Sequence, residues 1–129
     1  MNLLFGFQGR ISRQPFWLIK LMLVVLNAVV HLAIFASIGR ERLASVSSHH
    51  DFWRQVGALN VIVLLVLAIV TVWIALAAGV KRFHDRDKAG WWVLIFFVPV
   101  IGELWYIIEC GFLPGTIGRN RFGADPLAK

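Results

Sequence analysis

The feature that most constrains this chain is a run of apolar residues at 61–80, VIVLLVLAIVTVWIALAAGV, without a single charged side chain. A surface helix of a soluble protein has one apolar and one polar face, whereas this run is apolar on every face. Further apolar runs at 16–38 and 91–113 reach the roughly 20 residues that cross about 30 Å of hydrocarbon. Hydrophobic residues make up 59% of the 129 positions, against roughly 45–50% in soluble proteins. The sequence therefore predicts one integral membrane domain.

The order of polar and apolar segments predicts the architecture of an all-α membrane protein, a compact bundle of three hydrophobic helical segments. We expect an interfacial lead at 1–15, spans at 16–38 and 52–80, a third segment at 91–113 and a polar tail at 114–129. The second segment is longer than a crossing requires, so its helix can continue into KRFHD at 81–85. The single cysteine, Cys110, excludes an internal disulfide.

The third segment is interrupted by Pro99 and Gly102, which leaves two arrangements open. If it crosses fully, the segments assigned to the cytoplasmic side hold seven basic residues and the segments assigned to the outer side hold six. If it turns back as a re-entrant hairpin, the numbers are ten and three, as the positive-inside rule prefers for a cytoplasmic N-terminus. Glu109 would then return towards Lys20 or Arg82. The opposing argument is that each arm, at about eleven residues, is only half a crossing.

The stretch KRFHDRDK at 81–88 holds six of the twenty formal charges and a histidine. Such a stretch can be a solvated anchor that ends a membrane span. It mixes both signs, however, and His84 titrates near physiological pH. If the basic lead and tail meet this stretch, the three segments form a site suited to an anionic headgroup or phosphate. The candidate residues for that site are Arg10, Arg13, Arg82, His84, Asp85, Arg86, Arg119, Asn120 and Arg121.

Polar side chains inside apolar segments are candidates for function, because an unpaired polar group in lipid is unfavourable. They are Lys20, Asn27, His31, Asn60, Glu103 and Glu109. His31 and Asn60 lie at similar depths in two antiparallel spans, which predicts a hydrogen bond between them. Such a bond can be packing of about 0.6 kcal/mol or part of a proton or substrate path.

Four pieces of the sequence carry a resemblance: GRISRQPFW at 9–17, KRFHDRDKAGWW at 81–92, P-x-x-G at 99–102, and GTIGRNRFGADP at 115–126. Together they resemble the DUF805 family of small bacterial inner-membrane proteins. The family pattern has an arginine where this chain has Lys81, so the charge is kept but a bidentate guanidinium is lost. The resemblance implies an inner-membrane location and a helical architecture, and it implies little chemistry.

These observations favour a non-catalytic protein that binds anionic lipid headgroups or a protein partner through its cytoplasmic face. The alternative is an oligomeric proton- or ion-coupled transporter or channel built on the intramembrane polar residues. We expect no enzyme activity, because no nucleophile or metal-ligand spacing stands out. We expect no cofactor and no nucleic-acid partner, and we interpret the pair His49 and His50 as part of a solvated loop at 39–51. The partners we expect are membrane lipids, a second copy of the chain, or another membrane protein.

Overall fold

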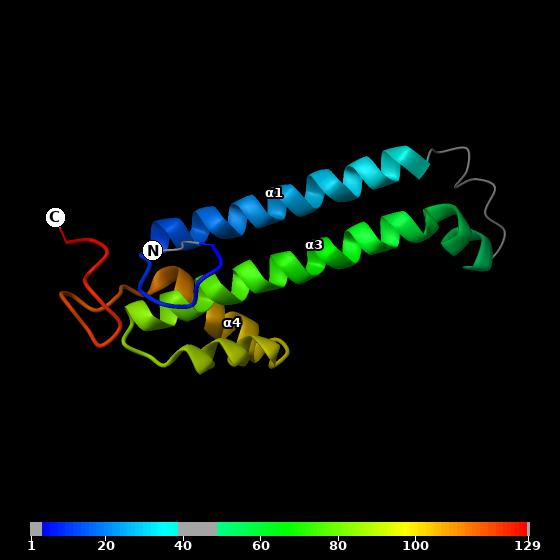
Figure 1. Ribbon diagram of the computed structural model, residues 1–129. Coiled ribbons are helices and arrows are strands. Elements are labelled where there is room, and N and C mark those ends of the chain that lie inside the picture. Colours follow the sequence, from blue (N-terminus) through cyan, green and yellow to red (C-terminus); the bar gives the residue numbers. More distant parts are fainter. Residues whose placement is uncertain (1–3, 39–48, 129) are drawn as a thin grey trace. The chain divides into compact units, whose positions relative to one another are not determined.

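Two long helices dominate the computed structural model, which describes residues 4–38 and 49–128 (Figure 1). Helix α1 runs Arg13–Ile38 and helix α3 runs His49–Asp85. Helix α1 begins three residues before the first predicted span and has Pro15 in its first turn, where the missing N–H would have had no helical partner. Helix α3 continues through residues 81–85, which confirms that the apolar helix carries the charged stretch on its last turn. Most of the predicted loop at 39–51, together with the side chains of His49 and His50, lies outside the described residues.

Helix α3 is interrupted once, at Gly57, whose φ of 73° and ψ of 147° are not helical. Only glycine adopts this conformation readily, because it has no Cβ. This kink lies within the second predicted span, 52–80. By length and composition, the described residues contain two helices that can cross a membrane, Arg13–Ala36 and Leu59–Asp85.

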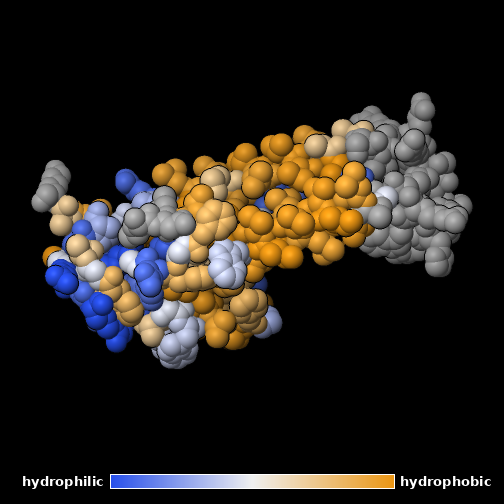
Figure 2. All heavy atoms as spheres, viewed as in Figure 1, coloured by the Kyte–Doolittle hydropathy of each residue, from blue (hydrophilic) through white to orange (hydrophobic). Residues whose placement is uncertain are grey.

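The surface of these two helices is apolar, as a lipid-facing surface must be. Leu18, Val24 and Leu32 on α1, and Leu59 and Ile69 on α3, are all more than half exposed. Figure 2 shows that the visible face of the middle of the two long helices is mainly hydrophobic. In water such a surface would be unfavourable, whereas in hydrocarbon it needs no partner.

The third apolar segment is not one helix. A 3-10 helix, η1, covers Gly90–Phe97, helix α4 covers Ile101–Ile107, and a π-helical turn, η2, covers Ile108–Phe112. Between η1 and α4 the chain makes a γ-turn at Val100, where φ is 63° and ψ is −65°, with the Ile101 N–H 2.7 Å from the Pro99 carbonyl oxygen. Gly102 is required beside it, because a Cβ there would collide with the carbonyl oxygen of Ile95. The sequence prediction of a break at Pro99 and Gly102 matches this geometry.

Packing divides the chain into two compact units, Met1–Leu21 with Val72–Lys129, and Met22–Thr71. The first unit contains most of the buried side chains, among them Phe16, Ala77, Phe83 and Tyr106. At Gly79 a Cβ would lie 2.7 Å from the Tyr106 hydroxyl oxygen and 2.8 Å from Val93. The small residues near the end of α3 therefore let the third segment approach closely, which is one use of small residues in membrane helices.

The lead and the tail have no long helix of their own. Phe7 packs edge-on against Trp73 of α3 with ring centroids 5.1 Å apart, and the Trp73 indole donates to the Phe5 carbonyl at 3.2 Å. In the tail, Asn120 and Gly123 form an isolated bridge, and no strand occurs in the part of the chain that the structure describes. The fold is therefore all-α, as predicted.

Candidate functional site

The last turn of α3 carries a buried carboxylate held between two buried guanidinium groups. Asp85 accepts a hydrogen bond from Arg10 Nε at 3.1 Å, and its other oxygen forms an ion pair with Arg82 one turn earlier. Arg82 is 0% exposed, and Arg10 and Asp85 are each 3% exposed. A single buried ion is strongly unfavourable unless it is paired and hydrogen-bonded. The lead and α3 are therefore joined by charge, as the sequence suggested.

Arg10 uses every nitrogen of its guanidinium inside the protein. Besides Asp85, it donates to the carbonyl oxygens of Thr116 at 2.6 Å, Gly118 at 2.7 Å and Gly123 at 3.3 Å. A guanidinium has five N–H donors in a fixed plane and no acceptor. Because these donors are directed at the tail, Arg10 holds the tail backbone against α3 and has little left to offer an external anion.

The end of the third segment is held in the same way. A helix end leaves its last carbonyl groups without helical partners, and near a membrane these groups must be satisfied by the protein. Here five consecutive carbonyls, from 110 to 114, accept from side chains of the first unit. The donors are Arg82 to Cys110 at 2.7 Å, Trp17 to Gly111 at 3.1 Å, Arg13 to Phe112 at 3.2 Å, Arg82 to Leu113, and Arg86 to Pro114 at 3.1 Å.

The tail in turn satisfies the end of α3. Thr116 donates its backbone N–H at 2.8 Å and its hydroxyl at 3.0 Å to the carbonyl of Asp85. Asn120 donates to the carbonyl of His84 at 2.8 Å. Asp87 takes the left-handed conformation, with φ of 55°, that ends a helix in a Schellman turn, and the Lys88 N–H reaches the Phe83 carbonyl at 2.9 Å. Thr116 and Trp17 were not singled out from the sequence, because an ordinary threonine and tryptophan give no signal of such a role.

His84 is fixed by the lead and the tail. Its ring stacks on Phe122 with centroids 3.9 Å apart and planes 6° from parallel, and Nδ1 lies 3.2 Å from the carbonyl oxygen of Gly9. Because a carbonyl oxygen only accepts, Nδ1 carries the proton of this bond. The neighbouring carboxylate, Asp85, faces two arginines, so the two side chains are not arranged as a general-base pair.

A second set of ion pairs, whose cations are partly exposed, lies just beyond the end of α3. Glu109 pairs with Arg86 at 2.8 Å and with Lys88. These partners replace the Lys20 or Arg82 that the sequence had suggested for Glu109. Their contacts show that both ends of the third apolar segment lie at the last turn of α3. The carboxylate is almost completely buried, so its two cationic partners offset its desolvation.

The remaining tail arginines are exposed. Arg121 pairs with Asp87 at 3.2 Å and donates to the Asp87 carbonyl at 2.6 Å. Arg119 makes no hydrogen bond or ion pair within residues 4–38 and 49–128. Lys81, where the family pattern has arginine, is 0% exposed. Arg119 and Arg121 are therefore accessible at the surface, whereas Lys81 is not.

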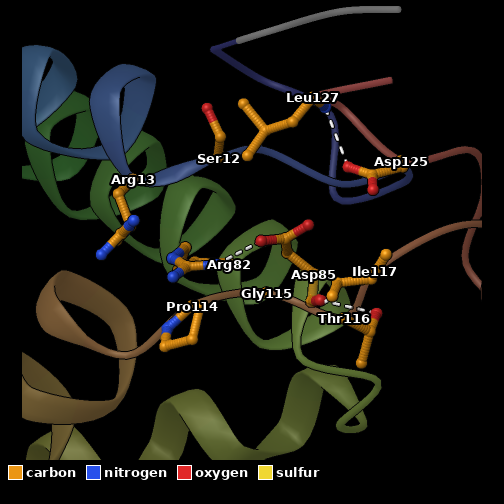
Figure 3. A pocket seen from close by; sticks show the side chains of 10 residues that line it. All are labelled: Ser12, Arg13, Arg82, Asp85, Pro114, Gly115, Thr116, Ile117, Asp125 and Leu127. Carbon is orange, nitrogen blue, oxygen red and sulfur yellow. Dashed lines mark hydrogen bonds and ion pairs between the residues drawn. The ribbon is translucent and has the colours of Figure 1, made fainter. Parts of the chain in front are cut away.

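A cavity of about 130 Å³ lies beside the buried network (Figure 3). Arg13 and Ser12 stand on one side of it, Arg82 and Asp85 lie beneath it, and the tail residues complete its wall. The lining residues are Ser12, Arg13, Arg82, Asp85, Pro114, Gly115, Thr116, Ile117, Asp125 and Leu127. Asp125 is tied at its rim, because its two oxygens accept the backbone N–H groups of Gly118 and Leu127, both at 2.9 Å. These bonds hold the pKa of the Asp125 carboxyl below its usual value.

The intramembrane polar residues of the second unit bond to one another locally. Asn27 Nδ2 donates to Thr71 Oγ1 at 3.0 Å and to the Leu23 carbonyl at 2.8 Å. His31 Nδ1 lies 2.7 Å from the Asn27 carbonyl oxygen. The interhelical hydrogen bond of this unit joins Asn27 to Thr71 of α3. The bond between His31 and Asn60 that depth suggested stays a prediction. Glu103 is exposed in the first turn of α4.

Among the residues that the structure describes, no group of three metal-ligating side chains gathers at one place. The geometry defines a class of protein: an all-α membrane protein whose lead, second long helix and tail are tied by a buried arginine–aspartate network. The chain belongs to the DUF805 family, described as "Protein of unknown function", which it matches over residues 4–124.

Several proteins of Escherichia coli are similar to the chain over most of its length. Inner membrane protein YhaH of strain K12 is 31% identical over 123 residues, covering 94% of this chain and 87% of that protein. Inner membrane protein YhaI is 33% identical over 122 residues, covering 94% and 86%. Uncharacterized protein YiiR is 27% identical over 146 residues, covering 95% and 86%. No solved structure matches the chain. Together with its two candidate membrane helices, this kinship identifies an inner-membrane protein.

Proposed function

We propose that this protein is a non-catalytic membrane module that binds phosphate-bearing anionic lipid headgroups at its cytoplasmic face. The observation that carries the proposal is the charge beneath the cavity. Two buried guanidinium groups, Arg10 and Arg82, face one buried carboxylate, Asp85. The buried network therefore keeps one positive charge, and a buried charge is screened far less by salt than an exposed one.

The direct contacts to a headgroup come from residues around that charge. Arg13 is exposed and uses one of its five N–H groups on the Phe112 carbonyl, and Ser12 adds a hydroxyl. Arg119 of the tail is also exposed, and its guanidinium makes no hydrogen bond or ion pair within residues 4–38 and 49–128. Arg82 has no exposed surface, so it acts through its field and not through a hydrogen bond to the ligand. Asp125 adds a negative charge at the rim, already bound by two N–H groups.

The orientation that this function requires is a cytoplasmic lead and tail with a re-entrant third segment. It is supported by the turn at Val100 and by the contacts of Glu109 with Arg86 and Lys88. On that arrangement the cytoplasmic side holds ten of the thirteen basic residues, in line with the positive-inside rule. They are Arg10, Arg13, Lys20, Lys81, Arg82, Arg86, Lys88, Arg119, Arg121 and Lys129.

The test is binding of phosphatidylglycerol against phosphatidylcholine to the purified protein in neutral detergent, measured by native mass spectrometry. The double variant Arg13→Gln/Arg119→Gln should weaken phosphatidylglycerol binding about tenfold or more, since each basic residue near an anionic surface is worth about 1 kcal/mol. The wild-type preference should also weaken as salt rises.

The matched control is Arg54→Gln, which removes a positive charge from the opposite side of the membrane on the proposed topology. It should leave the preference for phosphatidylglycerol unchanged. An equal loss in this control would mean that only net charge matters, and equal binding of the two lipids by the wild type would refute headgroup recognition.

A further inference from the structure

Lys20 lies two turns into α1, surrounded by aromatic rings. Its ammonium nitrogen is 4.9 Å from the ring centroid of Tyr106, 5.7 Å from that of Phe16 and 5.8 Å from that of Phe96. The rings come from α1, η1 and α4, so this arrangement exists only after the third segment has folded back. At 1.5 Å per residue, Lys20 is about 10 Å along the helix from Arg13.

The ammonium has no oxygen partner within residues 4–38 and 49–128. Glu109, which the sequence suggested as a partner for Lys20, forms ion pairs with Arg86 and Lys88 instead. Aromatic faces attract a cation by about 0.5–2 kcal/mol, but they do not satisfy its three N–H donors. An unsatisfied ammonium in an apolar segment is unfavourable, and such residues usually mark a binding site or a path.

A cavity of about 90 Å³ opens beside Lys20. Apart from Lys20 and the Tyr106 hydroxyl, the side chains around it are apolar. They are Val72, Ala75, Leu76, Val93, Phe96 and Phe97. Val72, Phe96 and Phe97 are 51%, 41% and 61% exposed, so the cavity is reached from the surface that faces lipid. None of these residues lines the cavity beside Asp85.

We propose that Lys20 binds the monoanionic head of an acyl-chain amphiphile, with the first methylenes of the chain in this cavity. One cation matches one negative charge, and apolar walls favour a ligand with a hydrocarbon chain over a free inorganic anion. A fatty-acid carboxylate and a phospholipid phosphodiester share this chemistry. The site is independent of the headgroup site proposed above.

The test measures binding of palmitate, phosphatidylglycerol and the uncharged analogue methyl palmitate to the purified full chain in neutral detergent, by native mass spectrometry. Lys20→Met keeps the length of the side chain and removes its charge. It should weaken binding of one anionic amphiphile at least tenfold and leave methyl palmitate unchanged, whereas Lys20→Arg should retain binding. Palmitate binding without phosphatidylglycerol binding would identify the carboxylate as the head, and the reverse would identify the phosphodiester.

Two further variants separate this site from general effects of charge and folding. Ala75→Leu fills the cavity while keeping Lys20, so it should also abolish the Lys20-dependent binding. Arg54→Met removes a positive charge outside both proposed sites and should leave it intact. The proposal is overturned if Lys20→Met binds palmitate and phosphatidylglycerol as the wild type does, or if Arg54→Met loses as much as Lys20→Met. It is also overturned if Ala75→Leu has no effect while its melting temperature matches that of the wild type.

Discussion

Arg10 Nε donates to Asp85 Oδ1 across 3.1 Å, although the two residues are 75 positions apart in the sequence. The bond joins the lead to the last turn of α3, and the same guanidinium continues to three carbonyls of the tail. One side chain therefore connects three segments that are distant in the sequence. A ligand site formed by these three segments would depend on that connection.

Removing the carboxylate of that pair should destabilise the protein strongly. Asp85→Asn leaves Arg10 and Arg82 buried without their anion, and breaking a buried pair in this way costs about 3–5 kcal/mol. Asp87→Asn is the control, because its pair with Arg121 is exposed and such pairs contribute about 0–1 kcal/mol. Thermal unfolding in detergent measures both, and equal shifts in melting temperature would contradict the role given to Asp85.

Two substitutions at the turn of the third segment should change the stability of the protein in opposite directions. Val100→Gly removes a β-branched side chain from a backbone conformation with φ of 63°, and strain of this kind costs about 1–3 kcal/mol. It should stabilise the fold or leave it unchanged. Gly102→Ala should destabilise it, because the added Cβ meets the Ile95 carbonyl. The same unfolding assay decides, and a stable Gly102→Ala protein would be inconsistent with this tight turn.

The side of the membrane on which the tail lies can be measured directly. In a Cys110→Ala background, a cysteine placed at Ala128 should resist an impermeant thiol reagent in intact spheroplasts and react once the membrane is opened. A cysteine at Ser47, between α1 and α3, should react in intact cells. Labelling of position 128 from outside would exclude the re-entrant arrangement and the shared cytoplasmic face.

The polar residues of the second unit should behave as packing contacts. Asn27→Leu removes the hydrogen bond to Thr71. It should lower the free energy of unfolding by about 0.6 kcal/mol, the average for such bonds in membrane proteins, and by no more than about 1.7 kcal/mol. His31→Asn should change stability by about 1 kcal/mol or less, because the ring contacts a carbonyl four residues earlier on its own helix. Ion or proton flux in proteoliposomes should equal that of empty vesicles, and flux that His31→Asn abolished would instead support a transport function.

The turn around Asp125 should open on acidification. Its pKa is lowered by the N–H groups of Leu127 and Gly118, so its contribution is present above the unfolded pKa of about 3.9 and is lost as pH falls through the lower folded value. Amide exchange of Gly118 and Leu127, followed against pH, should rise in that acidic window beyond the intrinsic trend. Asp125→Asn should remove this dependence, and an unchanged profile in the variant would show that another group controls the turn.

Much of the fold could be predicted from the sequence, because hydrophobicity and backbone restrictions act locally. Long apolar runs predict that the chain enters the membrane, and the two long helices lie close to the positions of those runs. Pro99 and Gly102 determine a break, since one lacks an N–H and the other lacks a Cβ. The kink at Gly57 was missed, because a single glycine in an apolar helix is usually tolerated.

Only the tertiary structure decided how the polar groups are used. The sequence could gather Arg10, Arg82 and Asp85 into one candidate site, but it could not tell a donor directed at a ligand from one directed at the chain's own carbonyls. It likewise suggested Lys20 or Arg82 as partners for Glu109, whose carboxylate pairs with Arg86 and Lys88. The physical reason is that a hydrogen bond or ion pair depends on distances of about 3 Å and on direction, which are set by packing between segments far apart in the sequence. Whether a helix lies in the membrane can be predicted from its local composition, whereas the partners of its polar side chains are known only from the completed fold.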